Sequence, residues 1–162
     1  MFDTATYDKK GNLMESIIHQ RVKLSQEGKN PSAICKVSSG WVVLGDTHMR
    51  HGYCILLSDP VVFSINDLPQ KEREAFLFEM TVIGDAILSS TNCYRINYEI
   101  ECNGEQALHA HIIPRYADEP DQIRERPVWL SPGWKNAPQF SLEIHTKLMD
   151  DIKAYIRKVI PD

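Results

Sequence analysis

Residues 107–115, which read Ala-Leu-His-Ala-His-Ile-Ile-Pro-Arg, contain two histidines separated by one residue, in a segment that is typical of a β-strand. Successive side chains of a strand point to opposite faces of its sheet. One face therefore carries His109 and His111, flanked by Ala107 and Ile113. The other face carries apolar residues that can be buried, namely Leu108, Ala110 and Ile112. The segment thus predicts two imidazoles side by side on one face of the sheet, with a packed apolar layer on the other face. This arrangement suits the binding of a metal ion or a phosphate.

The composition of the chain fits one globular domain spanning residues 1–162. Of its 162 residues, 43% are hydrophobic and 25% are charged, and the net charge is −4. No broad basic surface is available for a nucleic acid polymer, although a small phosphate ligand needs only a local positive pocket. The sequence contains no apolar run that predicts a membrane span.

The four cysteines are scattered, and none forms a Cys-x-x-Cys pair, so a structural zinc site is not expected. We expect reduced, buried thiols instead. The first residues lack the basic flank and apolar run of a secretory signal, and together with the cysteine usage this favours a cytoplasmic protein.

Hydrophobic periodicity predicts the elements around the histidine strand. A first helix is expected at 12–27, with Asn12 as its N-cap, and a long helix at 69–88. The stripe of apolar residues on the long helix is Phe76, Leu77, Met80, Ile83 and Ile87. The last helix, 141–160, carries a stripe of Ile144, Leu148, Ile152, Tyr155, Ile156 and Val159. Further strands are expected at 34–37, 41–45, 53–57 and 94–100. This order predicts an α+β fold with helices on an antiparallel sheet.

The connection after Arg115 is charged and irregular, and Trp129 and Trp134 are expected to hold it against the body of the protein. Residues 117–162 therefore form a C-terminal extension.

Three interpretations of the paired histidines remain open. They are structural residues without further function, or part of a metal site, or catalysts at a phosphorus atom. A metal site would need further ligands from His48, His51, Asp46 or Glu99. In the catalytic interpretation, one neutral imidazole attacks phosphorus, and a second, protonated imidazole stabilises the phosphate oxygens or protonates the leaving group.

The segment 94–115 resembles the signature of the histidine triad (HIT) family, in which histidines alternate with hydrophobic residues and Pro-Arg often follows. Anchored on Pro114-Arg115, His109 matches the middle histidine and His111 the last. The resemblance implies that His109 is the nucleophile that forms a nucleotidyl-histidine intermediate, and that His111 binds the transferred phosphate. It also implies phosphate contacts from Asn97, Asn103 and Gly104.

The resemblance covers residues 33–116, which it implies are the core of the domain. Within them, residues 42–57 resemble the two strands that precede the long helix in this family. Asp46 matches the acid that binds the ribose, and Tyr53 occupies the place of a family histidine. Ala107 replaces the first histidine of the triad, but its backbone carbonyl is retained and matches the carbonyl that orients the nucleophile. His48 or His51 stands in for a missing imidazole in this interpretation.

The function implied by the resemblance is hydrolysis or transfer at the α-phosphate of a nucleotide conjugate, either a dinucleoside polyphosphate or a nucleoside phosphoramidate. The resemblance implies a homodimer and no required cofactor or bound metal, with Mg²⁺ expected only alongside a polyphosphate substrate. Two alternatives stay open: a nucleotide-binding protein with little turnover, because the triad is incomplete, and a metal protein built on the His-x-His pair.

Overall fold

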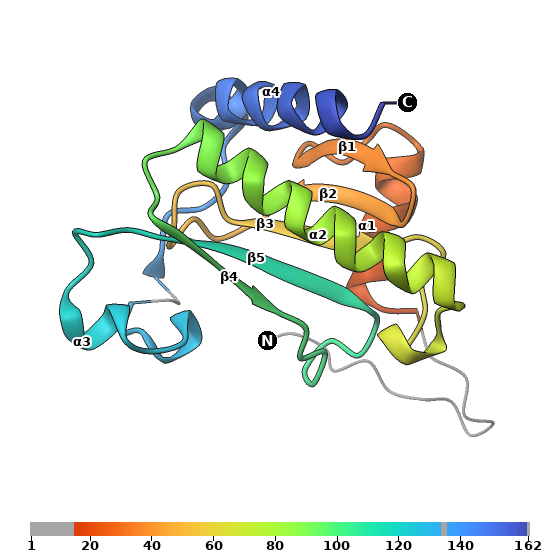
Figure 1. Ribbon diagram of the computed structural model, residues 1–162, viewed down its shortest axis with the longest axis horizontal. Coiled ribbons are helices and arrows are strands. Elements are labelled where there is room, and N and C mark those ends of the chain that lie inside the picture. Colours follow the sequence, from red (N-terminus) through yellow and green to blue (C-terminus); the bar gives the residue numbers. More distant parts are fainter. Residues whose placement is uncertain (1–14, 134–135, 162) are drawn as a thin grey trace.

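The predicted order of helices and strands is confirmed in the computed structural model, which describes residues 15–133 and 136–161 (Figure 1). Four α-helices, five strands and two 3-10 helices lie in these described ranges. The helices are α1 (Ile17–Gln26), α2 (Gln70–Ser90), α3 (Asp121–Arg124) and α4 (Leu142–Val159), with 3-10 helices η1 (Ile65–Asp67) and η2 (Val128–Leu130). The strands are β1 (Ala33–Val37), β2 (Gly40–Leu44), β3 (Cys54–Ser58), β4 (Arg95–Glu99) and β5 (His109–Arg115).

The strands form one antiparallel sheet in the order β1-β2-β3-β5-β4. The histidine strand β5 is therefore internal, and β4 lies at an edge. Leu57 of β3 is opposite His109, while both Ile55 of β3 and Glu99 of β4 are opposite His111. Because cross-strand partners point to the same face, this register surrounds the two histidines with side chains from both neighbouring strands.

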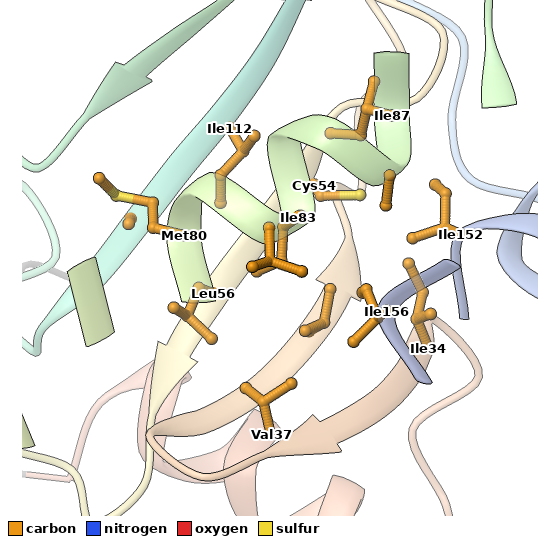
Figure 2. Packing of buried hydrophobic residues seen from close by; sticks show 14 of the residues in the cluster. Ile34, Val37, Cys54, Leu56, Met80, Ile83, Ile87, Ile112, Ile152 and Ile156 are labelled. Atoms are coloured by element: carbon orange, nitrogen blue, oxygen red, sulfur yellow. The ribbon is translucent and has the colours of Figure 1, made fainter. Parts of the chain in front are cut away.

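One face of the sheet packs against α2 and α4 and forms the larger core (Figures 1 and 2). Leu108, Ala110 and Ile112 are fully buried there, as the strand alternation predicts. Burying each large aliphatic side chain contributes about 1.5 to 3 kcal/mol. Figure 2 shows Ile112 beside Met80 and Ile83 of α2, with Ile152 and Ile156 of α4 nearby. This packing fixes the strand from the side opposite the histidines.

The opposite face carries a second, smaller core to which α1 and the C-terminal extension contribute. Ile18 and Val22 of α1 and Val128 of η2 pack with Ala107 and Ile113. The face that carries the histidines is thus partly covered by segments from both ends of the chain, neither of which belongs to the predicted core of residues 33–116.

Several predicted details are wrong. Helix α1 begins at Ile17 because Ser16 caps it, accepting a hydrogen bond from the amide of His19; the proposed cap Asn12 lies outside the described residues. Leu77 is 41% exposed, so it does not belong to the core stripe of α2. Ile144 and Val159 are likewise exposed on α4. The charged connection after Arg115, expected to be irregular, contains the short helices α3 and η2.

Candidate functional site

His109 and His111 lie next to each other on the α1 side of β5, with ring centroids 4.7 Å apart and the rings nearly perpendicular. His109 is 7% exposed, and His111 is partly buried. Burial lowers the pKa of both imidazoles below the ordinary value of 6.5. Both histidines are consequently neutral at pH 7.

The ring of His109 is oriented by the backbone of Ala107. Its Nδ1 lies 2.7 Å from the carbonyl oxygen of Ala107. A carbonyl only accepts hydrogen bonds, so Nδ1 carries the proton and Nε2 keeps its lone pair. The resemblance implies this contact, and it needs only a backbone group, which explains how alanine is accommodated at position 107.

The Nε2 atoms of both histidines have no hydrogen-bond partner among the described residues. The lone pair on Nε2 of His109 is therefore not used in a contact with any described side chain. A neutral imidazole with a free Nε2 lone pair is a competent nucleophile near neutral pH.

His111 is enclosed by two aromatic side chains. The Tyr53 hydroxyl lies 2.6 Å from Nδ1 of His111, and the Tyr53 ring is stacked at 5.9 Å between centroids. Trp129 of η2 packs edge-on against the imidazole at 4.8 Å. Burial and the neighbouring His109 lower the pKa of His111 to about 3. The expectation of a protonated second histidine is therefore wrong for this conformation, because desolvation disfavours the cation.

Gly45 makes room for Tyr53. A Cβ atom at position 45 would lie 2.3 Å from Cδ1 and Cε1 of the Tyr53 ring, which is far closer than side chains tolerate. The backbone at the end of β2 thus approaches the tyrosine ring directly. Tyr53 is 4% exposed and packs against Gly45 as well as His111.

Asp46, the predicted ribose-binding acid, is half-exposed and forms an ion pair with Arg21 of α1. The Arg21 guanidinium is close enough to lower the pKa values of both His109 and Tyr53. Arg21 therefore places a positive charge beside the histidines, which the prediction from the sequence missed because α1 lies outside the family signature.

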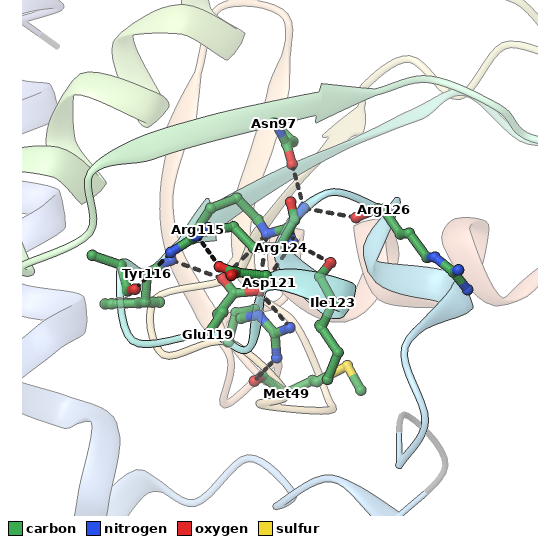
Figure 3. A network of polar contacts seen from close by, with 11 residues as sticks. Met49, Asn97, Arg115, Tyr116, Glu119, Asp121, Ile123, Arg124 and Arg126 are labelled. Atoms are coloured by element: carbon green, nitrogen blue, oxygen red, sulfur yellow. Dashed lines mark hydrogen bonds and ion pairs between the residues drawn. The ribbon is translucent and has the colours of Figure 1, made fainter.

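Asn97 shares the histidine face, but its side-chain oxygen accepts a hydrogen bond from Arg115 at 2.9 Å. Arg115 is 3% exposed and also donates to the carboxylate of Glu119 (Figure 3). Its remaining donors bind backbone carbonyl oxygens of the extension, those of Ile123, Arg124 and Arg126. Arg115 and Asn97 thus hold the C-terminal extension in place, and the structure gives Asn97 a protein partner where a phosphate contact was expected.

Asn103 and Gly104 lie in an exposed turn before β5. The adjacent Cys102 has a positive φ of 51° and places its sulfur 3.7 Å from Nδ1 of His109. The turn therefore begins beside His109. Among the described residues, no contact joins the Asn103 side chain to His109 or His111.

His51 and His48 belong to a separate group of rings. His48 stacks on His145 of α4 at 3.9 Å, and His51 lies 6.4 Å from His145. In the described part of the chain, neither ring contacts His109 or His111, so the structure gives the place beside His111 to Tyr53. Phe140 of the extension completes this group, 5.7 Å from His145.

The metal interpretation lacks a ligand set in the described residues. No group of three or more His, Cys, Asp or Glu side chains is arranged there to hold a metal ion. The three-histidine group does not provide one, because the rings of His48 and His145 stack face to face. No helix in residues 15–133 and 136–161 is long and apolar enough to cross a membrane.

Comparison with solved structures identifies the class of fold. A histidine triad protein from Sinorhizobium meliloti 1021 superimposes with a TM-score of 0.65 at 19% identity, covering 82% of this chain and 93% of the other. One from Bradyrhizobium japonicum gives 0.64 at 16% identity, with coverages of 95% and 99%. A hypothetical histidine triad nucleotide-binding protein from Sulfolobus tokodaii gives 0.65 at 12% identity, with coverages of 86% and 93%.

The chain therefore has the α+β fold of histidine triad proteins, and the resemblance in residues 94–115 is confirmed at the level of the fold. Comparison with models of protein families and with curated proteins gave no match. The sites of the solved structures accordingly carry over to this chain only as proposals.

Two further site residues were not assigned from the sequence alone. Tyr53 was noted only as the replacement for a histidine, and Trp129 only as a residue that holds the extension. The sequence contained a signal for Tyr53. This residue directly follows Gly52, and the alternation of strand side chains places it on the same face of the sheet as the histidines. Trp129 had no local signal, since its position depends on the path of the extension.

Proposed function

We propose that the protein is a nucleotide-conjugate hydrolase or nucleotidyl transferase that acts through His109. The observation that carries this proposal is the hydrogen bond from Nδ1 of His109 to the Ala107 carbonyl, which leaves the ring neutral with its lone pair on Nε2. The fold shared with a histidine triad nucleotide-binding protein supports a nucleotide as the ligand. Dinucleoside polyphosphates and nucleoside phosphoramidates are the substrate classes proposed.

In the first step, the lone pair on Nε2 of His109 attacks the α-phosphorus. A P–N bond forms, the bond from phosphorus to the leaving group breaks, and the leaving group departs with the electron pair and takes a proton from solvent. In the second step, water attacks the same phosphorus, the P–N bond breaks, and the proton lost by water passes to solvent. The products are the nucleoside monophosphate and the leaving group, and His109 is neutral again.

The surrounding residues support binding in this scheme. The Ala107 carbonyl stabilises the positive charge that develops on the His109 ring, because it already accepts the Nδ1 proton. Asp46 is proposed to bind the ribose hydroxyls once it leaves its ion pair with Arg21. Arg21 is then free to approach the phosphate oxygens. Mg²⁺ is expected only with a polyphosphate substrate, where it would neutralise charge on the bridging oxygens.

Intact mass after mixing with adenosine 5′-phosphoramidate or a diadenosine polyphosphate, quenched with denaturant at alkaline pH because the P–N bond is labile in acid, tests this proposal. The expected result is a mass gain of one adenylyl group, together with release of AMP. The gain disappears in His109→Ala and persists in the matched control His19→Ala, because His19 lies on α1 and only caps the helix through Ser16. An adduct that survives in His109→Ala would refute the role of His109.

A second candidate function is nucleotide binding with little turnover. The low exposure of His109, 7%, favours it, because an in-line attack needs room around Nε2. Saturable binding of AMP by calorimetry, without adduct or product, would support this candidate over the enzyme.

We also propose a homodimer that uses the edge of the sheet. Strand β4 is an edge strand, and edge strands offer unpaired backbone groups to a partner. Leu77 and Leu88 of α2 are each 41% exposed and lie on the helix face that carries Gly84, against which the hydroxyl of Tyr98 packs. Sedimentation of the wild type and of Leu77→Lys/Leu88→Lys tests this, since two buried charges at such an interface would give monomers.

A further inference from the structure

We infer that Tyr53 is a positioning residue that holds His111 as the tautomer with its proton on Nε2, so that His111 is a fixed, neutral hydrogen-bond donor for a phosphate oxygen. This inference rests on the proposed function for the identity of the ligand. The tautomer itself is a property of the free protein and is tested separately from activity.

The distance between the two side chains indicates which one donates. The Tyr53 oxygen and Nδ1 of His111 are 2.6 Å apart. Hydrogen bonds donated by N–H groups to oxygen are usually 2.7–3.2 Å long, so 2.6 Å is short for an imidazole N–H that donates to the tyrosine oxygen. A phenol is also a stronger acid than a neutral imidazole N–H, so the tyrosine O–H donates to the lone pair on Nδ1. The single proton of neutral His111 then resides on Nε2.

The surroundings keep both groups in these protonation states. Tyr53 is 4% exposed, and burial together with Asp46, Cys54 and Glu99 raises its pKa, opposed only by Arg21. The pKa of His111 is lowered by burial and by His109. Tyr53 therefore stays protonated near neutral pH, and its hydroxyl group remains a hydrogen-bond donor.

The two histidines of the site consequently hold opposite tautomers. The Ala107 carbonyl places the proton of His109 on Nδ1 and leaves Nε2 as a base, whereas Tyr53 places the proton of His111 on Nε2 and makes it a donor. A nucleophile and a donor thus lie with ring centroids 4.7 Å apart, without any charge on either ring. Since neutral His111 gives up its proton only with great difficulty, the leaving group receives its proton from solvent.

Nitrogen NMR of protein labelled with ¹⁵N-histidine tests the inference, because protonated and unprotonated ring nitrogens have well-separated chemical shifts. The His111 signals are assigned by their loss in His111→Asn. In the wild type at pH 7 we expect an unprotonated Nδ1 and a protonated Nε2, unchanged between pH 8 and pH 5. A proton on Nδ1, or a cationic ring at pH 7, would overturn the inference.

The matched variants are Tyr53→Phe, which keeps the ring in its buried place, and Tyr98→Phe, which removes a hydroxyl from the opposite side of β4. We expect Tyr53→Phe to shift the His111 nitrogens toward a mixture of both tautomers, and Tyr98→Phe to leave them unchanged. An unaltered His111 tautomer in folded Tyr53→Phe would also overturn the inference.

Activity measurements then separate this inference from the proposed function. If the protein hydrolyses a nucleotide conjugate, Tyr53→Phe lowers kcat up to about tenfold, the effect of losing one orienting hydrogen bond. A protein without activity that shows the predicted wild-type tautomer and its change in Tyr53→Phe would refute the enzyme and keep the positioning role.

Discussion

The indole of Trp129 lies edge-on against the imidazole of His111, with 4.8 Å between the ring centroids. The indole N–H donates to the carboxylate of Glu99, the residue of β4 that is directly opposite His111 in the sheet. The C-terminal extension is therefore tied to the edge strand and to the site by one side chain. Trp129, which lies 18 residues further along the chain, thus covers one side of the His111 ring.

Replacing Trp129 with alanine is expected to raise the pKa of His111 from about 3 toward 6.5, since the exposed imidazole regains its hydration. NMR titration of the His111 ring measures this change. Trp41→Phe serves as the control, because Trp41 packs on the same face at β2 and its indole binds Asp59 instead. A pKa that stays near 3 in Trp129→Ala would mean that other residues bury His111.

Replacing Arg115 with methionine is expected to lower the free energy of unfolding by about 3 to 5 kcal/mol. The change leaves Glu119 buried, although Arg50 still binds it, and leaves the carbonyl oxygens of Ile123, Arg124 and Arg126 without a donor. Urea denaturation measures the loss. Arg95→Met, at an exposed position of β4, should change stability by no more than about 0.5 kcal/mol. Equal effects of the two substitutions would contradict the role assigned to Arg115.

Gly45→Ala is expected to displace the Tyr53 ring, because the new Cβ would lie 2.3 Å from it. We expect a loss of about 1 to 3 kcal/mol in stability from overpacking, and His111 nitrogen signals like those of Tyr53→Phe. In a Tyr53→Leu background the same glycine substitution should cost clearly less, giving a coupling that a double-mutant cycle detects. If the stability losses of Gly45→Ala and Tyr53→Leu simply add, the contact between residue 45 and the Tyr53 ring is not the cause of the destabilisation.

Acid should destabilise the protein partly through His48. Burial and the nearby His145 and His51 lower its pKa to about 4, while Asp46 and the Gly45 backbone oppose this shift. Because the folded pKa lies below the unfolded value of 6.5, the unfolded chain binds the proton first as the pH falls. The contribution of neutral His48, on the order of 2 to 3 kcal/mol, is present above pH 6.5 and is lost between pH 6.5 and pH 4.

The substitution His48→Phe keeps a ring on His145 and removes the titrating group. Its stability should therefore fall less steeply between pH 6.5 and pH 4 than that of the wild type, as measured by urea denaturation at a series of pH values. Curves of identical slope would show that His48 does not contribute to the acid sensitivity.

The fold was predictable because its elements are encoded locally. The alternation around His109 and His111 gave the two faces of β5, and the periodicity of residues 69–88 gave the long helix α2. Both ends of strands β1, β2 and β3 lie within one residue of their predicted limits. The start of α1 was wrong because Asn12 and Ser16 both satisfy the capping preference, and only the structure shows that Ser16 is used.

The site was only partly predictable because it is assembled from distant segments. The pair His109 and His111 and the Ala107 carbonyl belong to one strand, so their arrangement follows from alternation. Arg21 and Trp129 approach the same pair from α1 and η2, and no local pattern encodes those tertiary contacts. The partner of Asn97 was also not predictable. Nothing in the sequence distinguishes Arg115 from a surface arginine, and its ion pair with Glu119 depends on how the chain folds back after β5.

Strand β5 serves two surfaces at once, since its even-numbered residues fill the core under α2 while its odd-numbered residues carry the imidazoles. Deleting one residue within this strand would shift the following side chains by one step and exchange the two surfaces beyond that point. The number of residues in this strand is therefore constrained as strictly as their chemical character. Laboratory evolution of this protein should accept only conservative substitutions at the buried apolar positions Ala110, Ile112 and Ile113 and reject almost every insertion or deletion in β5.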